Sequence, residues 1–541
     1  MRSDDMQDKF KSSTVYQIYI KSFCDSNGDG IGDINGIRSK LPYIKSLGVK
    51  YIWVTPFFCS PMADNGYDVS DYRNVNPMFG TMEDCEKMIA EADALGMGFM
   101  FDMVFNHTSD EHEWFKKALA GDPEYIDYYI FRDNPPEWTS IFGGSAWKFV
   151  PSLGKSYLHL FDPKQPDLNW DNPKVREELK DVVRFWKAKG VKGFRFDVLN
   201  RISKPADLES LPSGNGGAFC KDGPHVHEYI QELVRDTGIG DMITVGEMAS
   251  TTLEQCIRYS SPESHELSMC FNFHHLKVDY KDGDKWTLMP PDLKELRRIF
   301  SEWQEGMSKA GSWQALFWCN HDQPRVVSRF GDEVKYWKES AKMLATFIHF
   351  LRGTPYIYQG EELGMTNAHF NSISQYQDVE ALNYYEIMRD KGVSESDALK
   401  VLASKSRDNG RTPMQWNSGH GAGFTDGESW LGIPMNYTRI NVETEEHDPD
   451  SILKYYRHLV KLRKEYRVIA DGDVKFLDTG NDNVIAYERT SGTERLVVIC
   501  NFSGNDEKVT GIDIKGRVLI GNYSGTHRMM KPYEVLAILQ A

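Results

Sequence analysis

The sequence predicts an α/β fold, a (β/α)8 TIM barrel with an inserted subdomain after the third strand and a C-terminal antiparallel β domain. Short apolar runs alternate with amphipathic helical stretches between residues 15 and 362. Eight consecutive βα units of this kind are typical of a closed parallel barrel. After about residue 470 short strands follow one another without intervening helices. The chain has 541 residues, which exceeds the length that a single hydrophobic core usually supports, so we expect several domains.

The predicted barrel strands are the eight apolar, β-branched or aromatic runs at 15–20, 49–56, 98–107, 190–198, 243–247, 267–273, 315–322 and 354–362. Helical periodicity lies between them, for example at 83–98 and 175–190, and both of these stretches end in a glycine, a common helix C-cap. Residues 108–173 are too long for an ordinary βα loop. We therefore divide the chain into barrel segments 1–107 and 174–470, an inserted subdomain 108–173 and a C-terminal domain 471–541.

The charge and cysteine content of the sequence limit the molecules that the protein is expected to bind. The formal net charge is −16, and this acidity opposes binding to nucleic acid or to an anionic membrane. None of the eight cysteines falls in a C-x2-C pair, so we expect reduced thiols. The N-terminus lacks an apolar signal segment, and no apolar run reaches 18 residues. We expect a cytoplasmic monomer or weak homo-oligomer that acts on a small molecule.

Acidic and basic side chains close several predicted strands, and the C-terminal strand ends of a barrel are where its chemistry occurs. The residues concerned are Asp102 and His107 on the third strand, Arg195 and Asp197 on the fourth, Glu247 on the fifth, and His321 and Asp322 on the seventh. Any one of these four strand-end acids can be structural, but the whole set together indicates an active site.

Two carboxyl groups on neighbouring strand ends suit glycoside cleavage with retention, in which they lie about 5–5.5 Å apart. Arg195 precedes Asp197 by two residues and therefore shares its strand face, where its charge favours the ionised carboxylate. Asp197 is thus the predicted nucleophile. Glu247 follows the apolar run ITVG, surroundings that favour a protonated carboxyl, so it is the predicted general acid/base.

The segments DMVFNH, GFRFDVLN, TVGEM and FWCNHD resemble, in order, the four short motifs of the alpha-amylase family. The resemblance implies catalysis without a cofactor, with Asp197 as nucleophile, Glu247 as acid/base and Asp322 stabilising the distorted sugar. It further implies that three residues surround the first glucose, namely His107, Arg195 and His321. Within NGYD, Tyr67 resembles the residue that stacks on this ring. Asp64 and Arg407 resemble a pair that closes the pocket, which implies removal of terminal glucose units.

The loop at 25–33 predicts a structural calcium ion, because oxygen ligands recur with EF-hand-like spacing at Asp25, Asn27, Asp29, the carbonyl of Ile31, and Asp33. Gly36 stands where an EF-hand has its bidentate glutamate, so a true EF-hand is not expected, and such loops are often simple turns. The loop also resembles a calcium site of the oligo-1,6-glucosidase branch of the family.

The segment QPDLNW and Val198 resemble that same branch. Longer stretches, including DGPHVHEY, GEMASTTLEQCIRYS and NHDQPRVVSRFGDE, resemble its trehalose-6-phosphate hydrolases, which implies a phosphorylated disaccharide substrate. A phosphate monoester needs basic partners. Lys277 and Lys285 match lysines of that group. Lys281 replaces a proline common there, and Arg201 stands where an aliphatic residue is usual.

Three alternatives stay open on sequence alone. The first is an oligo-1,6-glucosidase or dextran glucosidase that acts on unphosphorylated isomaltosides. The second is transglycosylation like that of sucrose isomerases. The third is a non-enzymatic barrel binding protein, which the complete set of acids disfavours.

Overall fold

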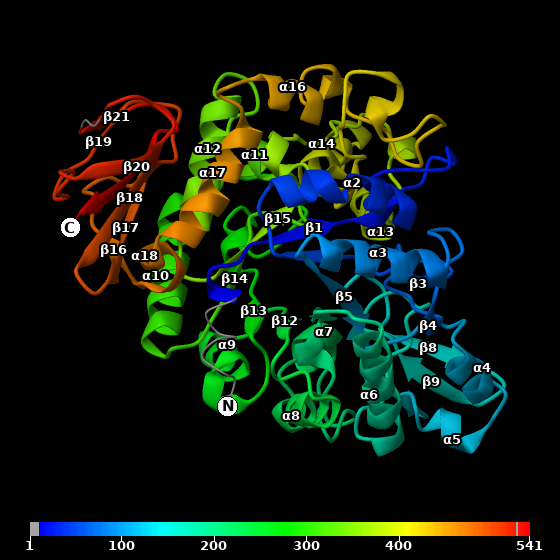
Figure 1. Cartoon of the computed structure of the whole chain (residues 1–541). Helices are drawn as coiled ribbons and strands as arrows, with labels where there is room; N and C mark the ends of the chain where they lie inside the picture. Colours follow the sequence, from blue (N-terminus) through cyan, green and yellow to red (C-terminus); the bar gives the residue numbers. More distant parts are fainter. Residues whose placement is uncertain (1–9, 526–527, 541) are drawn as a thin grey trace.

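The computed structural model describes residues 10–525 and 528–540 and confirms the predicted barrel (Figure 1). Its eight parallel strands are β1 (Val15–Ile18), β2 (Tyr51–Val54), β5 (Gly98–Val104), β10 (Gly193–Asp197), β12 (Ile243–Glu247), β13 (Met269–Phe271), β14 (Ala315–Leu316) and β15 (Thr354–Tyr358). They are hydrogen-bonded in the order β13-β12-β10-β5-β2-β1-β15-β14. A parallel bridge between Cys270 and Gln314 joins the two ends, so the sheet closes.

Helices surround the strands, which are buried along their whole length. This double burial explains why the strands read as apolar runs rather than as alternating patterns. The surrounding helices are α2 (Ile34–Ser46), α3 (Met82–Ala94), α6 (Pro173–Ala188), α8 (Val226–Thr237), α9 (Leu253–Ser260), α10 (Leu293–Lys309), α12 (Trp337–His349) and α17 (Ile452–Glu465). Asn172 caps the start of α6, and Gly190 follows its end with φ 96°, a value that favours glycine.

The inserted subdomain contains α4 (Glu113–Leu119), α5 (Pro123–Ile126) and an antiparallel sheet of β6 (Phe131–Arg132), β9 (Lys155–Leu158) and β8 (Trp147–Val150). It has its own apolar cluster, in which Trp138 and Leu158 are buried. Leu208 and Cys220, from the segment after β10, complete that cluster. In addition, β11 (Gly214–Asn215) pairs with β7 (Trp138–Thr139). A second stretch of chain therefore supports the inserted subdomain.

The segment after β15 forms an additional helical unit, which the sequence pattern did not indicate. It contains α13 (Val379–Asp390), α14 (Glu395–Lys405) and the short α15 (Asp408–Arg411). Its side chains bury a separate cluster that includes Tyr385 and Leu402 and receives Trp286 from the barrel. This unit brings Arg407 to the rim of the barrel.

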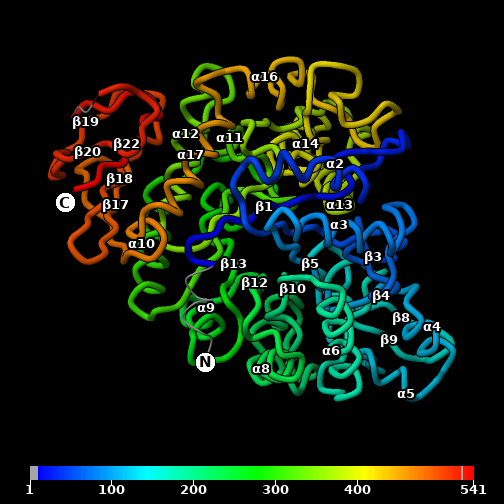
Figure 2. Tube along the Cα trace, in the orientation of Figure 1, coloured from blue at the N-terminus to red at the C-terminus, as the bar shows by residue number. Residues whose placement is uncertain are grey.

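The C-terminal domain is the predicted antiparallel sheet, in the order β16 (Asp473–Leu477), β17 (Val484–Ser491), β18 (Glu494–Asn501), β22 (Val535–Gln540) and β20 (Arg517–Gly521). Side chains alternate between its faces, so Ala486 joins the domain's own cluster whereas Tyr487 packs toward the barrel. The Tyr487 hydroxyl donates to the Phe347 carbonyl of α12 at 2.8 Å. In Figure 2 this red domain and the cyan inserted subdomain lie on opposite sides of the barrel. No helix within the described chain is long and apolar enough to cross a bilayer.

Candidate active site

Three carboxylates from adjacent strands meet around the guanidinium of Arg195. Its Nη1 donates to Asp102 Oδ1 at 2.7 Å and to Asp197 Oδ1 at 2.6 Å, and its Nη2 donates to Glu247. Arg195 is 1% exposed, so these contacts are largely shielded from water. The predicted contact between Arg195 and Asp197 is therefore present. The same guanidinium holds both predicted catalytic carboxyl groups.

Asp102 is the innermost of the three acids. Burial raises its pKa to about 7, against the opposing charge of Arg195. Its Oδ2 accepts hydrogen bonds from Trp53 Nε1 at 3.0 Å and from the Tyr67 hydroxyl at 2.9 Å. The negative charge of the neighbouring Asp197 raises the pKa of Asp102 further, so burial and this charge together outweigh the effect of Arg195.

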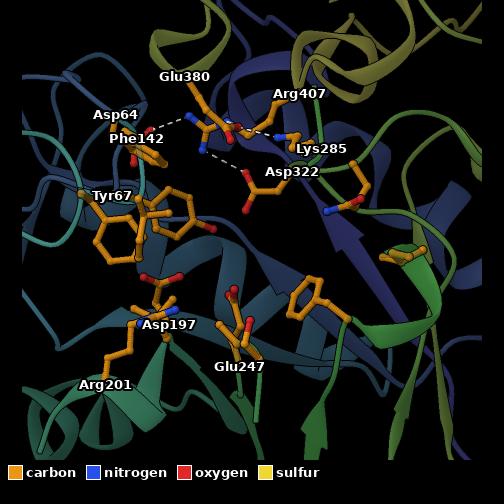
Figure 3. Close-up of a pocket in the computed structure, with 18 of the residues that line it drawn as sticks. Asp64, Tyr67, Phe142, Asp197, Arg201, Glu247, Lys285, Asp322, Glu380 and Arg407 are labelled. Carbon is orange, nitrogen blue, oxygen red and sulfur yellow. Dashed lines mark hydrogen bonds and ion pairs between the residues drawn. The ribbon is translucent and has the colours of Figure 1, made fainter. Parts of the chain in front are cut away.

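Asp197 and Glu247 end the neighbouring strands β10 and β12, which are paired in parallel register. Both side chains line the same cavity and are still partly accessible, at 10% and 12%. In Figure 3 they lie on one side of this cavity. A carboxylate and a second carboxyl group on adjacent strand ends can perform nucleophilic attack and proton transfer on one bond.

His321 and Asp322 follow β14. Asp322 lines the cavity, whereas His321 is fully buried against the ring of Tyr67. The Gln17 amide lies 2.9 Å from His321 Nδ1, which places the imidazole proton on Nε2 when Gln17 donates. Burial lowers the pKa of His321 to about 3, so it is neutral. Burial opposes ionisation of Asp322, but the positive charges of Arg407 and Arg411 hold its pKa below the usual range. Asp322 is therefore a fixed anion facing the cavity.

Tyr67 and His107, which the resemblance assigns to the first glucose, both line the cavity. The ring of Tyr67 stacks on His321, with centroids 5.1 Å apart and planes 1° from parallel. His107 Nε2 lies 3.0 Å from the Tyr67 carbonyl. Gln165, the first residue of QPDLNW, donates to that carbonyl at 3.0 Å and to Asp64 at 3.2 Å. The signature segment thus fixes the loop that carries Tyr67.

Asp64 and Arg407 lie together at one end of the cavity. Arg407 Nη2 lies 3.2 Å from Asp64 Oδ1 and 2.5 Å from Asp378 Oδ1, and its Nη1 lies 3.3 Å from Asp322 (Figure 3). Burial raises the pKa of Asp64 to about 7. The guanidinium also lies over the ring of Phe142 from the inserted subdomain, at 5.0 Å. These side chains together close this end of the cavity.

Both lysines predicted for the phosphate line the cavity, in different surroundings. Lys285 is paired with Glu380, with Nζ 2.6 Å from Oε2. Lys277 donates to the Ser250 hydroxyl at 3.0 Å. Arg201, which departs from the family pattern, also lines the cavity. Lys204, the next basic residue after it, does not line this cavity and is paired with Asp167 at 2.8 Å.

The predicted calcium loop is organised by its own side chains. Asp25 Oδ1 accepts from the amides of Asn27 and Gly28, and the same pattern links Asn27 to Asp29 and Asp29 to Ile31. Asp33 caps α2 by accepting from Gly36 at 2.7 Å. In the described residues, no three His, Cys, Asp or Glu side chains gather as a metal site. The donors are nonetheless all oxygens, the type that calcium prefers, so the calcium ion stays a prediction.

If calcium binds this loop, its addition should raise the melting temperature of chelator-treated protein, because a ligand bound only by the folded state stabilises it. At about 100 times the dissociation constant the gain is roughly 2.7 kcal/mol. Differential scanning fluorimetry with and without calcium measures this. Asp29→Asn should weaken the effect, whereas the exposed control Asp93→Asn should keep it. An unchanged melting temperature would count against a calcium site.

Several residues at the site are not predicted from the sequence, namely Asp378, Glu380, Gln323, Phe142 and Phe161. Asp378 and Glu380 belong to the unpredicted helical unit, where nothing in the sequence signals a partner for Arg407. Arg411 donates to Asp322 at 2.8 Å, and its only signal in the sequence is that it lies four residues after Arg407.

Known proteins share this architecture. The model of the alpha-amylase catalytic domain matches residues 17–472, and that of the alpha-amylase C-terminal all-beta domain matches 476–518. The trehalose-6-phosphate hydrolase of Bacillus subtilis is 47% identical over 543 residues, covering 97% of each chain. The oligo-1,6-glucosidase of Halalkalibacterium halodurans is 45% identical, covering 98% of each. The crystal structure of Bacillus licheniformis trehalose-6-phosphate hydrolase matches with a TM-score of 0.93 and 49% identity, over 98% of this chain and 99% of that one. This chain therefore belongs to the alpha-amylase family of glycoside hydrolases.

Proposed function

We propose that this protein is a retaining, exo-acting α-glucosidase that hydrolyses trehalose 6-phosphate to glucose and glucose 6-phosphate. The observation that carries the proposal is a cavity closed at one end by Asp64 and Arg407, which has the Asp197 and Glu247 carboxyl groups in its wall and the cation Lys277 on the same rim. The similarity to two trehalose-6-phosphate hydrolases, each over almost the whole chain, supports it.

In the first step Asp197 attacks the anomeric carbon of the unphosphorylated glucose, and a covalent bond forms between its oxygen and that carbon. The bond from this carbon to the glycosidic oxygen breaks as Glu247 gives its proton to that oxygen, so glucose 6-phosphate leaves. Glu247, now ionised, removes a proton from water, and the hydroxide oxygen attacks the same carbon. Asp197 is released, and glucose leaves as its α-anomer.

The geometry of the closed end supports exo-action. A terminal glucose fills the space between Tyr67 and the catalytic pair, while Asp64 and Arg407 leave no passage for a longer chain. Asp322, held ionised, carries a negative charge that stabilises the positive charge that develops on the sugar ring. The leaving sugar, with its phosphate, lies on the Glu247 side, where Lys277 contacts Ser250.

We expect the specificity constant, kcat/KM, to be higher for trehalose 6-phosphate than for trehalose, isomaltose or sucrose tested in parallel. One charge-assisted contact to a phosphate oxygen contributes about 1.5–3 kcal/mol. Lys277→Met should therefore lower the value for trehalose 6-phosphate roughly 10- to 200-fold. An isomaltose preference would indicate an oligo-1,6-glucosidase. Conversion of sucrose into an isomeric disaccharide would indicate transglycosylation.

A further inference from the structure

Four cations line the active-site cavity, and they differ in what they contact. Arg407 and Lys285 are each paired with carboxylates, Arg407 with Asp64 and Asp378 and Lys285 with Glu380. Arg201 and Lys277 form no ion pair with any residue in the described part of the chain. Paired cations are already neutralised, so an anionic substrate group gains most from the other two.

Arg201 is buried, with 6% of its surface exposed. Its Nη1 donates to the carbonyl of Gly217, and it lies 3.4 Å from that of Cys220. Its Nε is buried without a hydrogen-bond partner among residues 10–525 and 528–540. In the view of Figure 3 the side chain reaches toward Asp197, on the side of the cavity away from Arg407. The Arg201 charge is therefore held in the cavity wall by backbone carbonyls, without an ion-pair partner among the described residues.

Besides Arg201 and Lys277, Lys221 is a further cation near this part of the cavity, and it contacts Ser250 as Lys277 does. Lys277 Nζ donates to the Ser250 hydroxyl and Lys221 Nζ donates to the Ser250 carbonyl, each at 3.0 Å. Desolvation at the cavity wall, followed by the charges of Lys221 and Arg201, lowers the pKa of Lys277. The three cations thus repel one another, and a bound anion would relieve that repulsion.

The cluster also lies at the right distance from the chemistry. Ser250 is three residues beyond Glu247 and Arg201 is four beyond Asp197. A span of three residues is at most about 10 Å along the backbone, so Ser250 lies close to the acid that protonates the leaving sugar. The leaving sugar, protonated by Glu247, therefore extends toward Ser250.

We propose that Arg201 and Lys221, together with Lys277, bind the phosphate of the leaving sugar, whereas Lys285 positions Arg407 through Glu380 at the closed end. This rests on the proposed function. Arg201 fills a position where the family resemblance has an aliphatic side chain, so this chain adds a cation to the subsite. Glu380 Oε2 lies 3.5 Å from Arg407 Nε, which links Lys285 to the opposite end.

The test compares kcat/KM for trehalose 6-phosphate with kcat/KM for 4-nitrophenyl α-glucoside in purified full-length variants. Arg201→Leu and Lys221→Met should each lower the ratio of the two constants roughly 10-fold or more, by loss of a charge-assisted contact. Lys285→Met should lower both constants and leave their ratio unchanged. Lys281→Met, an exposed lysine of the same loop outside the cavity, is the matched control and should keep the wild-type ratio.

A second measurement avoids turnover of the phosphorylated substrate. Glucose 6-phosphate should inhibit hydrolysis of 4-nitrophenyl α-glucoside in the wild type, and its inhibition constant should rise at least 10-fold in Arg201→Leu and Lys221→Met. Inhibition by glucose should not change. If the wild type prefers trehalose 6-phosphate but both variants keep that preference and the wild-type inhibition constant, the phosphate assignment is wrong and the proposed function stands. A wild type without preference for the phosphorylated sugar overturns the proposed function itself.

Discussion

Asp197→Asn is expected to lower kcat at least 10⁴-fold on every α-glucoside, because the amide cannot form the covalent intermediate while its volume is nearly unchanged. The exposed Asp207→Asn, in the segment after the same strand, is the matched control and should keep full activity. Circular dichroism and the melting temperature establish that the variant is folded.

Glu247→Gln should differ from Asp197→Asn in one respect. Because 4-nitrophenol leaves without help from an acid, the first step on 4-nitrophenyl α-glucoside should persist, while the second step lacks its base. We therefore expect a burst of 4-nitrophenol close to one equivalent of enzyme, followed by slow turnover. Trehalose 6-phosphate, with its poor leaving group, should lose roughly 10²- to 10⁴-fold. A burst in Asp197→Asn instead, or β-glucose as the first wild-type product by NMR, would reverse or refute the assigned roles.

The candidate catalytic residues could be brought together from the sequence because of a property of parallel barrels. Strands that run in one direction end on one rim, so Asp197, Glu247 and Asp322 are expected together once the strands are recognised. The strands were recognisable because burial on both faces makes them continuous apolar runs. The sequence predicted the ends of the strands less well. The run 315–322 is predicted as one strand, but β14 spans only Ala315–Leu316, because the chain leaves the sheet before it reaches His321.

The remainder of the site depends on long-range contacts that no local pattern encodes. Glu380 pairs with Lys285 across 95 positions, and the amphipathic helix α13 that carries it gives no sign of this partner. The family resemblance placed Lys285 at the phosphate, but only the fold shows that its charge is already neutralised. Likewise, nothing local predicted that Lys221 and Lys277 would share Ser250.

Arg195 is the residue whose loss should most affect both stability and activity. Arg195→Met removes the cation that three carboxylates share, and breaking a buried ion pair in this way costs about 3–5 kcal/mol. Arg195→Lys keeps the charge but lacks the planar fork that reaches several strands at once. It should fold better than Arg195→Met and still lose roughly 10²-fold in kcat, because the catalytic carboxyl groups are no longer fixed in position.

The pH dependence tests this electrostatic origin. The pKa of Asp102 is raised to about 7 in the folded protein, above its value of about 4 in an unfolded chain. Below pH 4 Asp102 is protonated in both the folded and the unfolded chain, so its burial costs least there. As the pH rises through 7, the free energy of unfolding falls, because the buried carboxyl group must then ionise. Without Arg195 the three carboxylates repel one another more strongly, so the stability deficit of Arg195→Met should be larger at pH 8 than at pH 5. Equilibrium urea denaturation at both pH values measures the deficit.

Adding Asp102→Asn should recover part of the deficit at pH 8 and little at pH 5, because the amide removes one of the repelling charges. Equal deficits at the two pH values, with no recovery, would mean that Arg195 acts through packing rather than through its charge.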